Sequence, residues 1–214
     1  NKENTLIDLY TWSTPNGRKV SIMLEECGLP YTVHEIDIGK DQQFAPEFLA
    51  ISPNAKMPAI LDHDVEGEPV PVFESGAIMI YLAEKTGRFL PEGPLARKEL
   101  LEWMFWQVGN QGPMAGQLSH FKNYAPEGQD YGFKRYLGEY ERNLAVLERR
   151  LEQHDWILGP DYTIADIATG PWVRAARETY KAHDAFEMDK VPSVMAWLDR
   201  FLERPAVQRG LVQP

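Results

Sequence analysis

Two regions of the 214-residue chain differ in how apolar and polar residues alternate. In the first 87 residues, short apolar runs rich in Leu, Ile, Val and Tyr alternate with segments of helical periodicity. This pattern predicts the order β-α-β-α-β-β-α, in which a βαβ unit comes first and a hairpin follows. The predicted elements are strand 5–10, helix 15–28, strand 31–38, short helix 46–51, strands 58–62 and 70–73, and helix 75–85.

The remainder of the chain is predicted to be almost entirely helical. Residues 88–94 contain two prolines and a glycine and are typical of a linker. We therefore expect an α/β domain at 1–87, a linker at 88–94 and an all-α domain at 95–214. Beyond the linker, apolar residues recur three and four positions apart, which is the spacing of one buried helix face. These positions are Leu137, Tyr140, Leu144, Leu147 and Leu151, and then Val194, Trp197, Leu198, Phe201 and Leu202.

One helix start in this second region can be predicted from side-chain chemistry. Thr163 and Asp166 have the spacing of a capping box. The threonine hydroxyl accepts from an early backbone N–H, and the aspartate accepts from the N–H of the cap residue itself. We therefore expect a helix to begin directly after Thr163.

Charge and composition exclude several classes of function. The net charge of −10 and a pI near 5.0 argue against a nucleic-acid partner, which needs a basic surface. A single cysteine, Cys27, can form neither an internal disulfide nor a zinc-binding cysteine pair. The first ten residues carry no apolar signal-peptide core, and the longest apolar run, 77–83, is too short to cross a bilayer. We expect a cytoplasmic protein without nucleic-acid or membrane partners.

The first candidate site is the string Ser13-Thr14-Pro15-Asn16-Gly17, between a predicted strand and a predicted helix. A helix N-terminus carries free N–H groups and partial positive charge, so it favours an anion and promotes ionisation of a thiol. The Thr14 hydroxyl and the Asn16 amide can both donate a hydrogen bond to sulfur. Ordinary N-capping explains the same residues.

Two further strings carry candidate chemistry. A cis peptide at Met57-Pro58 would leave the backbone of Met57 open to pair with an extended peptide, although a trans proline at a strand start is commoner. At Glu74-Ser75 a strand gives way to a helix. Their carboxylate, hydroxyl and N–H match the ammonium and carboxylate of an α-amino acid, but capping and a solvated acid are the simpler explanation for either residue alone.

Taken together, these strings and their order along the chain resemble the cytosolic glutathione transferases. The resemblance covers about residues 5–205. It implies a thioredoxin-like N-terminal domain followed by a glutathione-transferase C-terminal helical domain. The most specific strings are similar to the bacterial Nu class of glutathione-dependent disulfide-bond oxidoreductases. These strings are TPNG at 14–17, GKDQQF at 39–44, ISPN at 51–54 and FWQVG at 105–109.

The resemblance also implies how glutathione is bound. Met57 would pair through its backbone with the cysteinyl part. Glu74 and Ser75 would bind the γ-glutamyl amine and carboxylate. Gln43, assisted by Lys56, would reach the glycyl end. The resemblance further implies a homodimer in which each small domain faces the helical domain of its partner.

Catalysis is assigned by the same resemblance to Thr14 and Asn16, which would face the sulfur. The string FKRY at 133–136 makes Arg135 the candidate for a contact from the helical domain, and a solvated helix face is the alternative for this arginine. Cys27 lies late in the first predicted helix, as a packed structural cysteine does. The thiolate that reacts would therefore come from glutathione.

The first hypothesis for function is reduction of small disulfides by glutathione, bound in its reduced or disulfide form and without a metal. Conjugation of glutathione to electrophiles, or reduction of organic peroxides, is the second. A glutathione-binding regulatory protein without catalysis is the third. The string Asp62-His63-Asp64 is predicted to be a polar turn, because a metal site needs a further ligand at suitable spacing.

Overall fold

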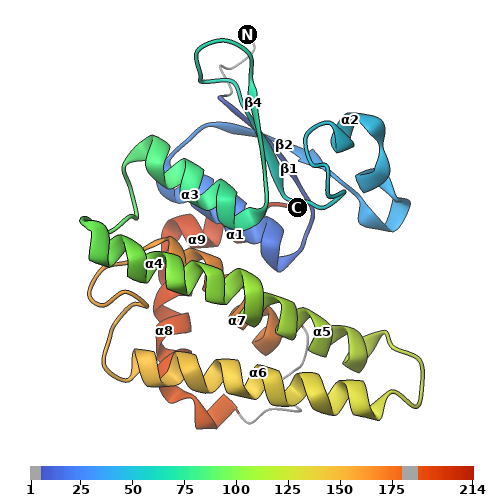
Figure 1. The fold of residues 1–214 in the computed structure, drawn as a ribbon, viewed down its shortest axis with the longest axis vertical. Helices are drawn as coiled ribbons and strands as arrows, with labels where there is room; N and C mark the ends of the chain where they lie inside the picture. Colours follow the sequence, from blue (N-terminus) through green and yellow to red (C-terminus); the bar gives the residue numbers. More distant parts are fainter. Residues whose placement is uncertain (1–5, 180–187) are drawn as a thin grey trace. The chain divides into compact units, whose positions relative to one another are not determined.

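The computed structural model of the protein describes residues 6–179 and 188–214. The chain forms two compact units, one made of Asn1–Arg88 with Arg204–Pro214 and the other of Phe89–Glu203. Figure 1 shows strands in the first unit and helices throughout the second. The elements of the first unit are β1 (Ile7–Thr11), α1 (Pro15–Cys27), β2 (Tyr31–Glu35), α2 (Pro46–Leu49), β3 (Ala59–Asp62), β4 (Val70–Phe73), α3 (Ser75–Thr86) and α9 (Pro205–Leu211).

The predicted order β-α-β-α-β-β-α is confirmed, and the ends of the elements differ by a few residues. Helix α1 starts at Pro15, whose fixed φ suits a first helical turn, and ends before Gly28, which has a φ of 67°. The strand predicted over 31–38 stops at Glu35, and two 3₁₀ turns follow it, Ile38–Lys40 and Gln42–Phe44. The predicted start of the first strand at Thr5 lies outside the described residues.

The sheet of the first unit has the strand order β2-β1-β3-β4. Strand β1 runs parallel to β2 and antiparallel to β3, and β3 pairs antiparallel with β4. Side chains of β1 alternate between buried and half-buried, so that Ile7, Leu9 and Thr11 face the core. This is the mixed sheet expected of a thioredoxin-like domain.

Helix α9 packs against α1, although the two are far apart in the sequence. The hydroxyl of Ser21 donates to the carbonyl of Gly210 at 2.7 Å. A Cβ on Gly210 would lie 2.5 Å from Cα of Ile22, so only glycine allows the helices to approach this closely. Arg204 donates to both carboxylate oxygens of Glu26, at 2.6 and 2.9 Å. The last residues of the chain, which the sequence pattern grouped with the helical region, therefore belong to the first compact unit.

The second unit is a bundle of helices around α7. Residues 164–173 of α7 are all buried, including Gly170, where a Cβ would lie 2.4 Å from the ring of Phe201. The helical face predicted at 137–151 packs inward on α6, with Tyr140, Leu144 and Leu147 buried. The α-helices of this unit are α4 (Pro94–Trp106), α5 (Gly112–Asn123), α6 (Asp130–Leu151), α7 (Ile164–Glu178) and α8 (Pro192–Glu203), and a π-helical turn, Gln107–Gln111, joins α4 to α5.

The predicted capping box at the start of α7 is confirmed and extends further than the sequence indicated. Asp166 accepts from the backbone N–H of Thr163 at 3.0 Å. It also accepts from the backbone N–H of Ile157 at 3.0 Å and from the indole N–H of Trp197 at 2.9 Å. Burial raises the pKa of Asp166 to about 6, and these donors oppose the rise. One carboxylate therefore ties α7, the preceding loop and α8 together.

Replacing this carboxylate should destabilise the second unit. In Asp166→Ala the three N–H donors lose their acceptor inside the protein, and we expect the free energy of unfolding to fall by about 3 kcal/mol. Urea unfolding followed by tryptophan fluorescence measures the change. Asp161→Ala, at an exposed position of the same loop, is the matched control and should shift stability by less than about 0.5 kcal/mol. Equal stability of the two variants would contradict the role given to Asp166.

Candidate functional site

The turn between β1 and α1 fixes the position of Thr14. Thr14 is the N-cap of α1, and its hydroxyl accepts from the backbone N–H of Gly17 at 3.1 Å. Gly17 is buried, and a Cβ there would lie 2.4 Å from the carbonyl oxygen of Trp12 and 2.5 Å from Oγ1 of Thr11. Only glycine fits this close approach. The string TPNG therefore forms a tightly packed turn at Gly17 as well as the helix cap at Thr14. Asn16 lies half-buried in the first turn of the helix.

The loop before β3 lies against this turn. The Met57-Pro58 peptide is cis. The hydroxyl of Thr14 donates to the sulfur of Met57 at 3.6 Å, which brings these two predicted site residues together. The loop itself is supported by the hydroxyl of Ser52, which donates to the carbonyl of Lys56 at 2.7 Å. Met57 also packs beside the cluster that α2 forms with the sheet around Phe48.

The junction of β4 and α3 presents the other predicted pair. Glu74 is exposed and has a φ of 70°, an unusual conformation for a residue with a side chain. Ser75 is the first residue of α3 and is buried. Its Oγ accepts a hydrogen bond from Nζ of Lys19 at 3.2 Å. This lysine was not predicted as a site residue, and it is one of the largest fully buried side chains of the protein.

The remaining predicted site residues lie apart from these contacts. Gln43 lies in the second 3₁₀ turn, and its buried side-chain oxygen has no hydrogen-bond partner within the described part of the chain. Lys56 is exposed in the loop before β3. Arg135 is exposed on α6, in the second unit. The structure therefore connects Thr14 with Met57 and Ser75 with the buried Lys19, all within the first unit.

Cys27 is the last residue of α1, at the opposite end of that helix from Thr14. Thirteen residues of helix separate the two ends by about 20 Å, at 1.5 Å per residue. Sγ of Cys27 lies 3.5 Å from the hydroxyl of Thr86. Burial raises the pKa of this thiol above its usual value, which disfavours the reactive thiolate. Cys27 has the surroundings of a structural cysteine.

The acidic turn after β3 is occupied by internal contacts. Asp62 is buried and accepts from the hydroxyl of Tyr81 at 2.7 Å, and Nζ of Lys85 lies 3.0 Å from the same oxygen. His63 lies 2.8 Å from the Asp8 carboxylate, which His34 also contacts at 2.9 Å. Within residues 6–179 and 188–214, no group of three or more His, Cys, Asp or Glu side chains is arranged to bind a metal.

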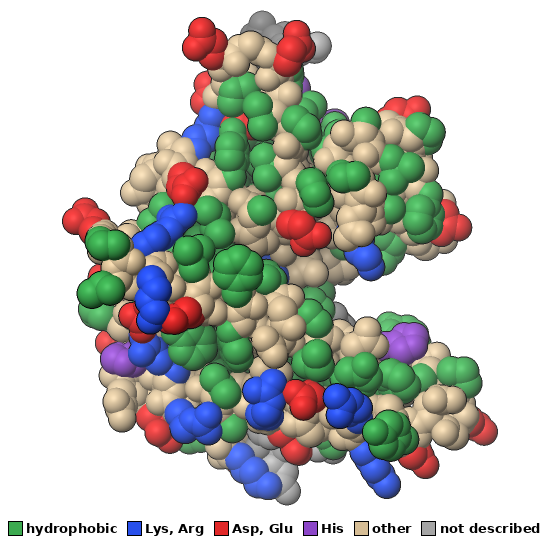
Figure 2. Space-filling view, viewed as in Figure 1, with side chains coloured by type: hydrophobic (Ala, Val, Ile, Leu, Met, Phe, Trp, Pro, Cys, Tyr) green, Lys and Arg blue, Asp and Glu red, His purple; other side chains and the backbone are tan. Residues whose placement is uncertain are grey.

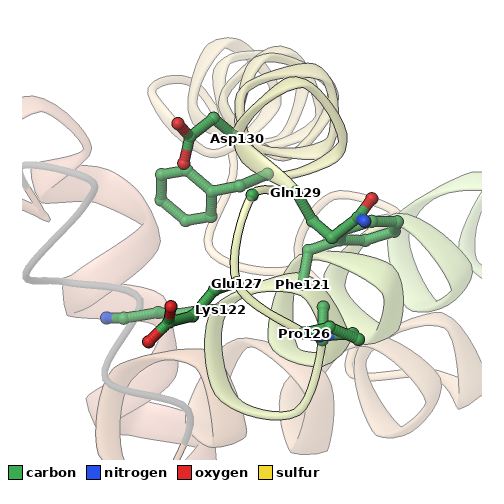
Figure 3. A pocket seen from close by; sticks show the side chains of 9 residues that line it. Phe121, Lys122, Pro126, Glu127, Gln129 and Asp130 are labelled. Carbon is green, nitrogen blue, oxygen red and sulfur yellow. The ribbon is translucent and has the colours of Figure 1, made fainter.

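A surface pocket lies where α5 passes into α6 (Figure 3). Its lining includes the ring of Phe121 and the charged side chains of Lys122, Glu127 and Asp130. Phe121 itself stacks on Tyr136 with ring centroids 5.4 Å apart. None of the predicted glutathione residues lines this pocket. The pocket belongs to the second unit and carries side chains of both charges.

On the face shown in Figure 2, basic and acidic side chains are interspersed among apolar ones. Among the helices that the structure describes, none is long and apolar enough to cross a membrane.

Comparison with known proteins relates this geometry to a family. A family model described as "Glutathione S-transferase, N-terminal domain" matches residues 14–85, and one described as "Glutathione S-transferase, C-terminal domain" matches residues 130–200. The chain is 47% identical over 210 residues to the disulfide-bond oxidoreductase YfcG of Escherichia coli. The matched region covers 97% of this chain and 95% of that protein.

Two solved structures are similar over the whole chain. A glutathione transferase from Burkholderia graminis with two glutathione molecules bound per subunit has a TM-score of 0.95 at 46% identity, covering 100% of this chain and 90% of that one. A glutathione transferase from Pseudomonas putida with one glutathione disulfide bound per subunit has a TM-score of 0.95 at 46% identity, covering 100% and 94%.

Proposed function

Because the chain belongs to the glutathione S-transferase superfamily, we propose that it reduces small disulfides with glutathione, whose thiol is activated by Thr14 and Asn16. The observation that carries this proposal is the position of Thr14 relative to Cys27. A hydroxyl at the N-terminus of α1 already directs a hydrogen bond at sulfur, that of Met57. The only cysteine of the chain is half-buried at the far end of the helix.

In the proposed complex, glutathione lies along the loop before β3. The backbone of Met57 pairs with the cysteinyl part, beside the Thr14 hydroxyl that contacts the sulfur of this methionine. Glu74 binds the γ-glutamyl ammonium, and Ser75, at the N-terminus of α3, binds the α-carboxylate. Gln43 and Lys56 are proposed for the glycyl end, where the unpartnered oxygen of Gln43 would accept a donor.

Arg135 remains a proposed contact from the helical unit. It is exposed on α6, so its guanidinium is available to a carboxylate of a bound ligand.

The proposed reaction has two exchange steps. The bound glutathione thiolate attacks one sulfur of the substrate disulfide, which forms a mixed disulfide and releases the other sulfur as a thiolate that takes up a proton. A second glutathione thiolate attacks the glutathione sulfur of the mixed disulfide. This step releases the second substrate thiol and forms glutathione disulfide. Two electrons pass from two glutathiones to one substrate, and no protein sulfur is oxidised.

The role of the α1 N-terminus in this reaction is electrostatic. The partial positive charge of the helix end and the donors of Thr14 and Asn16 stabilise the thiolate more than the thiol, so the thiol ionises at lower pH. The B. graminis and P. putida structures, with two glutathiones or one disulfide bound, support a site that accommodates two sulfurs. The reaction consumes reduced glutathione, so the cytosol is the proposed compartment.

We also propose a homodimer. Large apolar side chains are exposed on both compact units and are candidates for a contact between protomers. Phe105 on α4 is 68% exposed, and Phe44, in the 3₁₀ turn of the first unit, is 58% exposed. In the proposed dimer each small unit faces the helical unit of its partner.

The proposed activity is tested by turnover of 2-hydroxyethyl disulfide with glutathione. Wild type and Cys27→Ala should have equal rates, because the cysteine takes no part in the exchange. Thr14→Ala and Asn16→Ala should each lower kcat/KM by about tenfold, the effect of removing one hydrogen bond to a charged sulfur. Glutathione disulfide formation, coupled to its reduction by glutathione reductase, measures the rates.

Other outcomes of the same experiment select other functions. Loss of activity in folded Cys27→Ala would contradict the cysteine-free mechanism. Faster turnover of aryl halides or organic peroxides than of disulfides would favour conjugation or peroxide reduction. Glutathione binding by isothermal calorimetry without turnover of any of these substrates would favour a regulatory role.

The oligomeric state is tested by sedimentation velocity. We expect a species of twice the 24.5 kDa mass of one chain at micromolar concentration. Phe105→Glu should shift the distribution toward monomer if this side chain lies in the contact. A wild-type protein that sediments at the mass of one chain throughout the concentration range would contradict the proposed dimer.

A further inference from the structure

Lys19 is a buried charged residue that the proposed reaction does not use. It lies in the second turn of α1, and only 1% of its surface is exposed. A lysine is almost never fully buried unless its ammonium group has partners. Its Nζ donates at 3.2 Å to Oγ of Ser75, the first residue of α3. The side chain thus reaches from one helix to the residue proposed to bind the γ-glutamyl carboxylate.

We propose that Lys19 is a positioning residue for glutathione, which orients the Ser75 hydroxyl toward the γ-glutamyl α-carboxylate and supplies the buried positive charge that this carboxylate needs. The inference rests on the proposed function, since it assumes that Glu74 and Ser75 receive the γ-glutamyl group.

The hydrogen-bond direction supports this role. Nζ of a protonated lysine can only donate, so it occupies a lone pair of Ser75 Oγ. The hydroxyl hydrogen of Ser75 is then left to donate elsewhere. A carboxylate at the start of α3 would accept this hydrogen together with backbone N–H groups of the first turn. Without Lys19, the hydroxyl could turn its hydrogen away from the ligand.

The charges around Ser75 also favour a zwitterionic ligand. Burial lowers the pKa of Lys19 to about 7, and the negative charge of Glu74 opposes this effect. A carboxylate bound at Ser75 would add a second negative charge and favour the protonated lysine further. Glu74 is exposed and can receive the ligand ammonium. The pair Lys19 and Glu74 therefore places one charge of each sign at the two ends of an α-amino acid head group.

The test compares three tripeptides by isothermal calorimetry. One is glutathione, the second is 4-aminobutanoyl-cysteinyl-glycine, which lacks the α-carboxylate, and the third is glutaryl-cysteinyl-glycine, which lacks only the α-amino group. Wild type should bind glutathione at least about tenfold more tightly than the analogue without the carboxylate. Lys19→Met should bind glutathione and glutaryl-cysteinyl-glycine, which both keep the carboxylate at issue, about tenfold more weakly than wild type does. Its affinity for 4-aminobutanoyl-cysteinyl-glycine should change by less than twofold. In turnover, KM for glutathione should rise while kcat at saturation changes by less than twofold.

Lys85→Met is the matched control. It removes a lysine of the same unit that contacts buried Asp62, so it reports the effect of general destabilisation. This control should weaken all three tripeptides equally or leave them unchanged. Lys19→Gln, which keeps a donor but not the charge, should lie between wild type and Lys19→Met. If neither Lys19 variant folds, lysine-selective ¹³Cε NMR of wild type should show the Lys19 signal shift with glutathione and not with 4-aminobutanoyl-cysteinyl-glycine.

The outcomes separate the positioning role of Lys19 from the proposed glutathione-dependent function. If wild type binds glutathione but Lys19→Met loses affinity for all three tripeptides by the same factor, the role of Lys19 is structural and the inference is wrong. The inference is equally wrong if the Lys19 NMR signal shifts by the same amount with glutathione and with 4-aminobutanoyl-cysteinyl-glycine. If wild type does not bind glutathione at all, the proposed function fails together with the inference.

Discussion

The close packing of the turn between β1 and α1 is the constraint on which the candidate site depends. Gly17 lies against the carbonyl of Trp12 and the hydroxyl of Thr11, where any side chain would collide. This contact sets where α1 begins, and the N-cap and first turn of the helix then present Thr14 and Asn16. Since helix ends fray when they lack such support, a sulfur-binding site here needs a rigid turn as well as the right donors. The proposed chemistry follows from a helix N-terminus that packing holds in one place.

The same helix connects the two halves of the proposed site. Its N-cap residue, Thr14, contacts the loop of Met57, and its second turn contacts α3 through Lys19. Along its middle it packs against α9, where Gly210 permits contact with Ile22. The residues proposed for thiol activation and for recognition of the γ-glutamyl group are therefore built on one element. A rigid scaffold of this kind holds donors where charge develops and avoids reorganisation during the reaction.

Much of the fold was predictable because it depends on local chemistry. The proline at the start of α1, the glycine at its end and the capping box of α7 are short-range signals that the structure confirms. Strand ends differed, since pairing rather than propensity decides where β2 stops. The attachment of α9 to α1 depends on tertiary packing and has no signal in the local pattern.

The candidate site was predictable only in part. Thr14, Met57 and Ser75 lie in strings that carry family resemblance, and the structure places Thr14 against Met57 and Ser75 against Lys19. Lys19 was missed because a lysine beside Arg18 looks like a solvated residue. Helical spacing offered one signal, since Lys19 precedes Ile22 and Met23 by three and four positions and so shares their buried face. No local rule predicts that its ammonium group ends at Ser75.

The central proposal is that this protein lowers the pKa of the thiol of bound glutathione and uses no cysteine of its own. The direct measurement is a pH titration of the thiolate absorbance near 240 nm, for glutathione bound to saturating Cys27→Ala protein. The account predicts that the pKa of the bound thiol lies at least about one unit below the value of about 8.5 for a free thiol. A bound thiol whose pKa equals or exceeds that of free glutathione would contradict it.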